Sequence, residues 1–277
     1  MLLRRTGLSL ILAAAAVTAA RAETLVNTDF SKGSAGWVIN ADARLLDPGT
    51  SGITQVLALT TNEYGQTGVA WTEIRRRVPS FSFTADIRVR HTAEGFNACP
   101  ADGVALAFAP VETDAVGSGG GGLGLFGLEQ FTAFEINTYH GQGLGEGDCM
   151  DGGNVTFAID MVNPNTDASR GGERGTPETG GAKIGQVLPP DGMRIVNDDF
   201  YRYQWNVAAD GTMSVYVTGL GDRNKQFQKV KVLEVKFPDT KAIDFEGRWG
   251  LTAATGGSVQ HTDVLAARID VPMIDPL

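Results

Sequence analysis

Residues 101–110 read Ala-Asp-Gly-Val-Ala-Leu-Ala-Phe-Ala-Pro, a short apolar run between a glycine turn and a proline. Such a run suits a strand at the centre of a sheet, because both of its faces must be covered. Residues 81–90 instead alternate apolar and polar side chains, which is the pattern of a half-buried strand. Further segments of β type lie at 131–136, 155–159, 205–207, 213–217, 230–237, 249–253 and 264–271.

The connections between these segments indicate how the strands are arranged. The pair Asp210-Gly211 stands between two β segments and predicts a hairpin. No segment after the N-terminal region shows the period of an amphipathic helix. Residues 116–122 are almost all glycine and serine, and 163–191 are rich in Gly, Pro, Thr and charge, so both are expected to be loops. About a dozen strands separated by turns predict an all-β fold, an antiparallel two-sheet sandwich or jelly roll.

The composition limits the classes of partner. The chain has 277 residues, of which 36 are glycine, and a formal net charge of −9. This acidic balance argues against nucleic acid and against an anionic membrane surface as partner. An apolar fraction of 42% is sufficient for a large core. Because neither side of 163–191 alone has enough strands for a closed sandwich, we expect one domain rather than two.

The first 22 residues have the pattern of a signal peptide. Arg4 and Arg5 precede an apolar run at 8–20, and Ala20-Arg21-Ala22 fits a cleavage site. The run is shorter than the ~20 residues that span a bilayer, although a single membrane anchor is the alternative. We therefore predict a mature domain of residues 23–277, secreted or periplasmic and not inserted in a membrane. Export favours a disulfide between Cys99 and Cys149; two free thiols are the alternative.

Several common catalytic patterns are absent from the sequence. It contains no G-x-S-x-G, no H-E-x-x-H and no C-x-x-C motif. His91, His140 and His261 do not have the spacing of metal ligands. The glycine run at 119–122 is not followed by the Lys-Ser/Thr of a phosphate loop.

Four segments stand out in a fixed order along the chain. They are Ala-Asp-Gly-Val-Ala at 101–105, Gly-Gly-Gly-Leu-Gly-Leu-Phe at 120–126, Phe-Glu-Ile-Asn-Thr-Tyr at 134–139 and Gly-Leu-Thr-Ala-Ala-Thr-Gly at 250–256. Together they resemble the L-type, or legume-like, lectin domain, and the resemblance extends over residues 25–271. It implies a concanavalin A-like jelly roll of two antiparallel sheets, with a shallow glycan site on loops at one edge of the concave sheet.

The resemblance also assigns sugar-binding roles. The carboxylate of Asp102 is expected to accept hydrogen bonds from sugar hydroxyls, which are strong when the acceptor is charged. Gly121, or its neighbour Gly120, is expected to donate a backbone N–H, for which the lack of a side chain is required. The loop after Gly256 is expected to set specificity. The family's sugar-binding asparagine falls on Gly141, and Gln142 beside it is the candidate replacement.

In the family, the Ala–Asp peptide is cis and a metal loop braces it. Four positions of this chain match metal-binding positions, namely Glu135, Asn137, the backbone carbonyl of Tyr139, and Asp151. Asn137 stands for an aspartate and Thr156 for a histidine, so we predict that the transition-metal site is lost. Calcium needs oxygen ligands only, so Asn137, the Tyr139 carbonyl and Asp151 are expected to hold it together with Glu146 or Asp148. The alternative is that the loop is a solvated acidic segment without a metal.

The two cysteines fall next to the same loops. Cys99 lies three residues before Asp102, and Cys149 lies two before Asp151. A disulfide between them is predicted to replace part of the bracing that the metal provides in the family. In the family, the flat back sheets of two subunits often pack together, so a homodimer is one possible oligomeric state of this protein.

Three functions remain compatible with the resemblance. The first is a non-catalytic lectin, the second a glycoside hydrolase of the same fold, and the third a structural or protein-binding module that no longer binds sugar. Hydrolases of this fold carry Glu-x-Asp-x-x-Glu on one strand, and here only Glu135 of that pattern is present. We therefore predict a lectin that is not an enzyme.

Overall fold

A computed structural model describes residues 22–50, 52–91, 99–139, 155–162, 182–237 and 243–273. Within these residues the chain forms sixteen strands and two short 3-10 helices. The bounds are β1 (Ala22–Asp29), η1 (Phe30–Lys32), β2 (Trp37–Ala41), β3 (Arg44–Leu46), β4 (Val56–Thr60), β5 (Thr67–Thr72), β6 (Arg76–Arg77), β7 (Phe81–Arg90), β8 (Gly103–Ala109), η2 (Gly120–Gly122), β9 (Phe131–Asn137), β10 (Thr156–Val162), β11 (Ala182–Val187), β12 (Tyr201–Val207), β13 (Thr212–Gly219), β14 (Val230–Lys236), β15 (Glu246–Ala254) and β16 (His261–Pro272).

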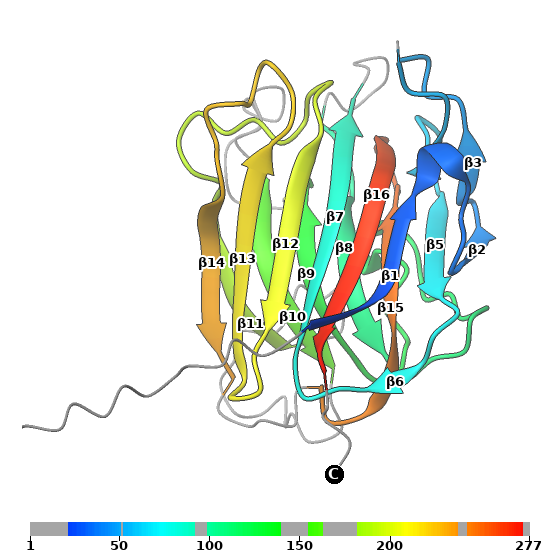
Figure 1. The fold of residues 1–277 in the computed structure, drawn as a ribbon. Coiled ribbons are helices and arrows are strands. Elements are labelled where there is room, and N and C mark those ends of the chain that lie inside the picture. Colours follow the sequence, from blue (N-terminus) through cyan, green and yellow to red (C-terminus); the bar gives the residue numbers. More distant parts are fainter. Residues whose placement is uncertain are drawn as a thin grey trace, which may run out of the picture.

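The strands make two antiparallel sheets that lie face to face (Figure 1). The back sheet, which faces the viewer, has the order β14-β13-β12-β7-β16-β4-β3, and β1 pairs with β16. The front sheet has the order β11-β10-β9-β8-β15-β5-β2, and β6 pairs with β15. The prediction of an all-β sandwich of two antiparallel sheets is confirmed.

Aromatic rings from both sheets meet in the core between them. The ring of Phe81, from the back sheet, lies edge-on to Trp205 at a centroid distance of 5.0 Å and to Trp249 of the front sheet at 5.6 Å. Such edge-to-face pairs add about 0.5–1.5 kcal/mol each to the burial of the rings. All three side chains are at most 4% exposed, so they fasten the sheets to each other.

The front sheet is also covered on its outer face. A second cluster contains Val69, Trp71, Ala105, Ala107, Ala109, Leu123, Leu125, Phe131 and Ala133. The segment 111–128 supplies Leu123 and Leu125, which pack on the small alanines of β8. Every residue of β8 is therefore buried, as the unbroken apolar run at 104–108 predicts.

Two local predictions have different outcomes. The Asp210-Gly211 hairpin is confirmed, since β12 and β13 pair on either side of it and Gly211 has a φ of +82°. The prediction of a loop over all of 163–191 is wrong at its C-terminal part, where β11 pairs with β10 at the edge of the front sheet. Ladder hydrogen bonds to β10 and the packing of Val187 against the core make this glycine-containing segment a strand. In the described part of the chain, no helix has the length and apolarity needed to cross a membrane.

Candidate functional site

Four strand ends meet at one edge of the front sheet. β9 ends at Asn137 opposite Gly103, where β8 begins, and Gly103 lies in turn opposite Ala254, where β15 ends. Ala254 also pairs with Thr67, the first residue of β5. Because neighbouring strands lie about 4.8 Å apart, the loops that leave these ends are neighbours in space although they are far apart in the sequence.

Asp102 occupies the centre of this edge, and its backbone is fixed from both sides. Its N–H donates to the carbonyl of Ala254 at 2.9 Å, and its carbonyl accepts from the N–H of Thr138 at 3.0 Å. The peptide bond between Ala101 and Asp102 is cis, as the resemblance implies. Gly103 follows with a φ of +151°, and a Cβ there would lie 2.4 Å from the carbonyl oxygen of Ile136. The close approach of β8 and β9 therefore accounts for glycine after the aspartate.

Two of the predicted glycines lie against the carboxylate of Asp102. A Cβ at Gly256 would be 2.8 Å from Asp102 Oδ2 and 3.5 Å from the Cα of Gly120. A Cβ at Gly120, whose φ is +60°, would be 3.9 Å from the same oxygen. The structure thus brings together Asp102, Gly120 and Gly256, which are some 150 residues apart at the extremes of the sequence. Gly121 is the next residue of η2 and is half-buried, whereas Gln142 lies outside the described residues.

The glycine loop, residues 117–124, is held in place by its own backbone hydrogen bonds and by one buried leucine. The carbonyl of Ser118 accepts from the N–H of Gly124 at 2.8 Å, and the N–H of Gly117 donates to the carbonyl of Gly124 at 2.8 Å. Leu123, which ends η2 in the left-handed region with a φ of 50°, is fully buried in the second cluster. An apolar anchor on the front sheet therefore positions the backbone of Gly120 and Gly121 beside Asp102.

Known structures share this arrangement of strands. The chain is similar to basic winged bean lectin with Tn-antigen, with 16% identity and a TM-score of 0.64 over 90% of this chain and 98% of that one. It is similar to the lectin from Bauhinia forficata in complex with GalNAc, with 16% identity and a TM-score of 0.62 over 92% and 99% of the two chains. The exoplasmic/lumenal domain of VIP36 in its Ca²⁺/Man-bound form has 15% identity and a TM-score of 0.58 over 87% and 91%.

The fold is that of the L-type lectins. No protein-family model matches the sequence, and no curated protein resembles it in sequence. The likeness is therefore one of backbone architecture. The roles of individual residues depend on the geometry of the site.

In this L-type lectin fold, the positions that the resemblance assigns to a transition metal hold an amide at Asn137 and a hydroxyl at Thr156, and the loss of that site stays a prediction. Glu135 is fully buried on β9, and Asn137 Nδ2 donates to its Oε2 at 3.3 Å. Thr156 of β10 lies opposite Asn137, at the position where the family has an imidazole. Among the described residues no group of three or more His, Cys, Asp or Glu side chains is placed to hold a metal.

Calcium requires only oxygen donors, and Glu135, Asn137 and the carbonyl of Tyr139 are of that type. The backbone of Tyr139 lies beside the site, since its N–H donates to the carbonyl of Asp102 at 3.4 Å. Asp151, Glu146 and Asp148, which would complete a calcium site, lie outside the described residues. Calcium binding therefore stays a prediction.

The segment before Asp102 is tied to the loop after Gly256. Cys99 is disulfide-bonded, and its carbonyl accepts a hydrogen bond from the hydroxyl of Ser258. Cys149 lies outside the described residues, so its pairing with Cys99 stays a prediction. The loop 257–260 leads directly into β16, which begins at His261.

A buried ionic cluster at the start of β16 is not evident from the sequence motifs. The fully buried carboxylate of Asp263 accepts from Arg88 at 2.7 Å and from Arg90 at 2.9 Å, and His261 lies 2.8 Å away. Burial alone would raise the pKa of Asp263, but the hydrogen bond and charge of His261, with those of the arginines, lower it below its usual value. The sequence does carry one sign of this cluster: two segments expected to be strands hold residues of opposite charge, arginine in one and aspartate in the other. The cluster fixes the base of the loop 257–260.

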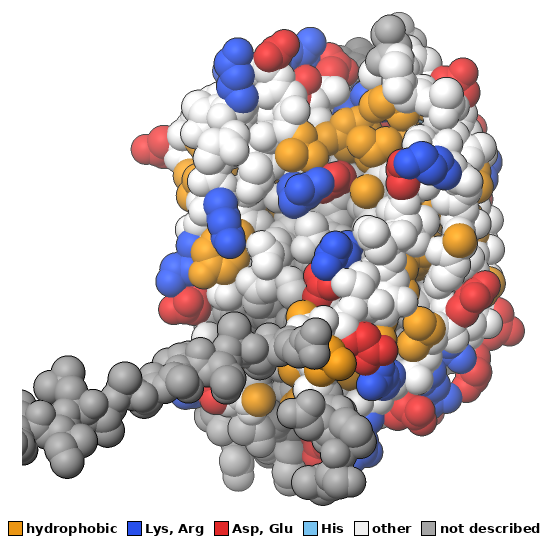
Figure 2. Space-filling view, viewed as in Figure 1, with side chains coloured by type: hydrophobic (Ala, Val, Ile, Leu, Met, Phe, Trp, Pro, Cys, Tyr) orange, Lys and Arg blue, Asp and Glu red, His pale blue; other side chains and the backbone are white. Residues whose placement is uncertain are grey.

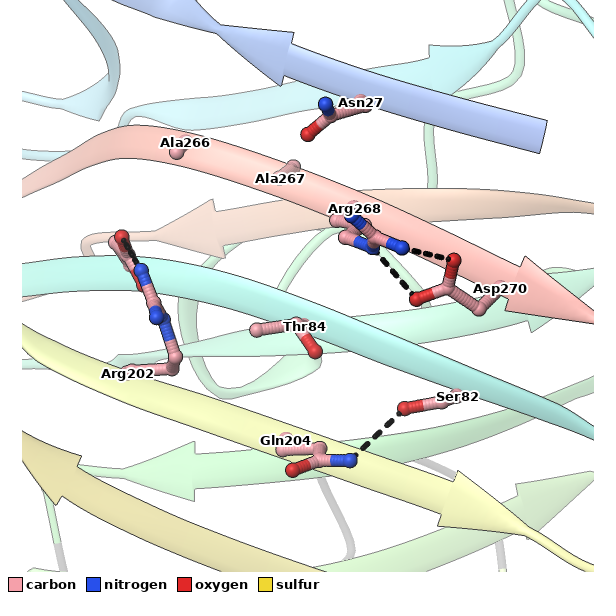
Figure 3. A pocket seen from close by; sticks show the side chains of 10 residues that line it. Asn27, Ser82, Thr84, Arg202, Gln204, Ala266, Ala267, Arg268 and Asp270 are labelled. Carbon is pink, nitrogen blue, oxygen red and sulfur yellow. Dashed lines mark hydrogen bonds and ion pairs between the residues drawn. The ribbon is translucent and has the colours of Figure 1, made fainter. Parts of the chain in front are cut away.

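The back sheet carries a separate hollow of about 410 Å³ over β12, β7, β16 and β1 (Figure 3). Its carboxylates are paired, since Arg202 makes two bonds of 2.7 and 2.8 Å to Asp86 and Arg268 binds Asp270. The rest of its lining is uncharged: Asn27, Ser82, Thr84, Gln204, Ala266 and Ala267. Figure 2 shows this face as largely uncharged, with basic and acidic side chains singly or in pairs. The hollow lies on the sheet opposite to Asp102 and is a second polar surface to be tested.

Proposed function

We propose that the protein is a non-catalytic lectin that binds a glycan at Asp102, at the backbone of Gly120 and Gly121, and at the loop after Gly256. The observation that supports it is the closeness of two glycines from distant loops to the Asp102 carboxylate, since a Cβ at Gly256 would lie 2.8 Å and one at Gly120 3.9 Å from Oδ2. A sugar hydroxyl both donates and accepts, so it pairs with a carboxylate oxygen and with a backbone N–H at one site. The glycines leave that backbone open to a ligand, because no side chain covers it.

A hydrolase of the same fold fits the geometry less well. A retaining glycosidase needs two carboxyls about 5–5.5 Å apart, and an inverting one needs them about 6.5–9.5 Å apart. On β9, the residues that share a face with Glu135 are Phe131, Ala133 and Asn137, none of which is acidic. Glu135 itself is fully buried, so it is not presented to a glycosidic oxygen.

Several finer features belong to the same proposal. Asn137, the Tyr139 carbonyl and Asp151, together with Glu135, would hold calcium, which would supply positive charge to these oxygen ligands. Gln142 takes the place of the missing asparagine, and a Cys99–Cys149 disulfide joins the sugar-aspartate loop to the metal loop. The mature protein acts outside the cytoplasm after removal of residues 1–22, as a monomer or a homodimer.

The test is a glycan array probed with the purified protein, with and without a chelator. Its printed glycans include mannose, GalNAc and Man₃GlcNAc, the sugars found with structures of similar fold. The Asp102→Asn variant keeps the shape of the side chain and removes its charge, and it is expected to abolish binding. Thr84→Gln narrows the hollow on the back sheet and is expected to leave binding unchanged.

Three results would contradict the proposal. Binding that survives Asp102→Asn but is lost in Thr84→Gln would move the glycan to the back sheet. Absence of binding to every glycan, with calcium present, would favour the structural or protein-binding module. Release of reducing sugar from β-glucans would favour the hydrolase.

A further inference from the structure

An exposed aromatic side chain lies on a loop beside the proposed glycan site. Tyr64 is 60% exposed, the highest value among the large apolar side chains of the described residues. An exposed tyrosine ring presents a flat apolar face together with a polar hydroxyl, which a ligand with both kinds of surface can cover. The loop 61–65 that carries it connects β4 of the back sheet to β5 of the front sheet.

This loop is folded tightly around one buried side chain. Gln66 is 5% exposed, and its Oε1 accepts from both the N–H and the hydroxyl of Thr61, at 2.6 and 3.0 Å. Its Nε2 donates to the carboxylate of Glu63 at 3.3 Å. The loop is therefore closed at both ends by a single amide side chain, which holds Tyr64 at its tip.

The same loop is bonded to the residue next to Gly256. The hydroxyl of Thr255 donates to the carbonyl of Glu63 at 2.6 Å and accepts from the N–H of Gln66 at 2.9 Å. The N–H of Thr255 donates to the carbonyl of Gln66 at 2.9 Å. Thr255 is fully buried, so the loop and the glycan site share one rigid connection.

The order of strands gives the spacing between Asp102 and the base of the loop that carries Tyr64. Asp102 precedes β8, Thr255 follows β15 and Gln66 precedes β5, and these three strands are consecutive in the front sheet. Two strand spacings amount to about 10 Å along the sheet edge. The base of the loop that carries Tyr64 therefore lies within the length of a short oligosaccharide from Asp102.

We propose that Tyr64 forms a second subsite, on which the sugar residue next to the one held by Asp102 stacks its apolar C–H face. The inference rests on the proposed glycan binding and deepens it, because it makes an oligosaccharide rather than a monosaccharide the preferred ligand. A neutral ligand is favoured, since stacking uses the uncharged face of the ring. Glu63, exposed beside Tyr64, would repel an acidic sugar at this subsite.

The experiment compares glycans that share a terminal sugar but differ in length. Wild-type protein, Tyr64→Ala and Tyr64→Phe are titrated with mannose and Man₃GlcNAc, and with GalNAc and GalNAc-terminated disaccharides. Leu220→Ala, which removes an exposed apolar side chain after β13 in the back sheet, is the matched control. Thermal unfolding of each variant checks that the fold is intact.

We expect Tyr64→Ala to lower the affinity for the longer glycan by roughly 3- to 10-fold, the range that one aromatic contact provides. Affinity for the monosaccharide should stay within 2-fold of wild type, and Tyr64→Phe and Leu220→Ala should behave as wild type. Equal loss for short and long glycans, or no loss for either, would overturn the subsite while leaving the Asp102 site in place. Failure of the wild-type protein to bind any glycan would overturn both.

Discussion

Gly256→Ala is the substitution that tests the glycan site most directly. The added Cβ would lie 2.8 Å from Asp102 Oδ2, whereas ordinary contact begins near 3.4 Å. Gly120 closes the other side, since its Cα would be 3.5 Å from the new carbon. The carboxylate therefore has to move by about 0.6 Å to regain ordinary contact, because the backbone of Asp102 is fixed by its bonds to Ala254 and Thr138.

A shift of this size exceeds the range of about 0.5 Å over which the length of a hydroxyl–oxygen hydrogen bond varies. Bonds between a hydroxyl and a carboxylate are about 2.5–2.7 Å long and lose most of their strength beyond about 3 Å. A hydrogen bond to a charged group contributes roughly 1.5–3 kcal/mol. Losing one of them at Asp102 should therefore weaken glycan binding by roughly 10- to 150-fold.

Leu220→Ala is the control, because it shortens an exposed side chain after β13 of the back sheet, away from the proposed glycan site. Isothermal titration calorimetry with the tightest glycan from the array gives the affinities, and thermal unfolding gives the stability of both variants. We expect Leu220→Ala to bind within 2-fold of wild type, and both variants to unfold at a temperature close to that of wild type. A Gly256→Ala variant that binds as tightly as wild type would refute the idea that the Asp102 carboxylate contacts the sugar.

Three further predictions concern what supports the site. Asp263→Asn leaves the buried Arg88 without its charged partner, so we expect a loss of about 3–5 kcal/mol in the free energy of unfolding, measured in urea. Because the pKa of Asp263 is lowered in the fold, its stabilisation is present above about pH 4 and is lost as the pH falls through the folded-state pKa; urea titrations of wild type and Asp263→Asn should converge in acid. Leu123→Ala should cost about 2–5 kcal/mol and also weaken glycan binding, since the leucine anchors the glycine loop; unchanged binding would contradict that link. Reduction of the Cys99 disulfide should lower glycan affinity measured by calorimetry, and unchanged affinity would refute its bracing role.

The sequence predicts the central strand and the site loops for different physical reasons. The run at 104–108 predicts β8 because a strand covered on both faces needs no polar alternation, and the structure covers it twice. The grouping of Asp102, Gly120 and Gly256 follows from the family resemblance, because no local rule relates residues so far apart. The motifs predict these positions, and the order of the strands in the front sheet explains why the three residues are neighbours.

The features that the sequence did not reveal depend on contacts between distant segments. β11 is a strand because β10 offers it a ladder of hydrogen bonds, and its own composition predicts a loop. The ionic cluster around Asp263 is buried because β7 and β16 are neighbours, although charged residues usually indicate an exposed strand face. In the sequence, Tyr64 is an ordinary turn residue. Its loop is seen to lie beside the site only through the hydrogen bonds of Thr255 to Glu63 and Gln66.

The strand register determines whether this site exists. Asp102 precedes Gly103, which pairs at once with Asn137 and Ala254, so the aspartate projects at the point where both partner strands end. A shift of one residue in either pairing would turn the small alanines of β8 away from the second cluster. The larger side chains of β8 would then face the cluster instead. Leu123 would then lose its place on the sheet, and the glycine loop would lose its position over Gly256. The apolar pattern that buries β8 on both faces is therefore also what aligns the carboxylate with the open glycine backbone.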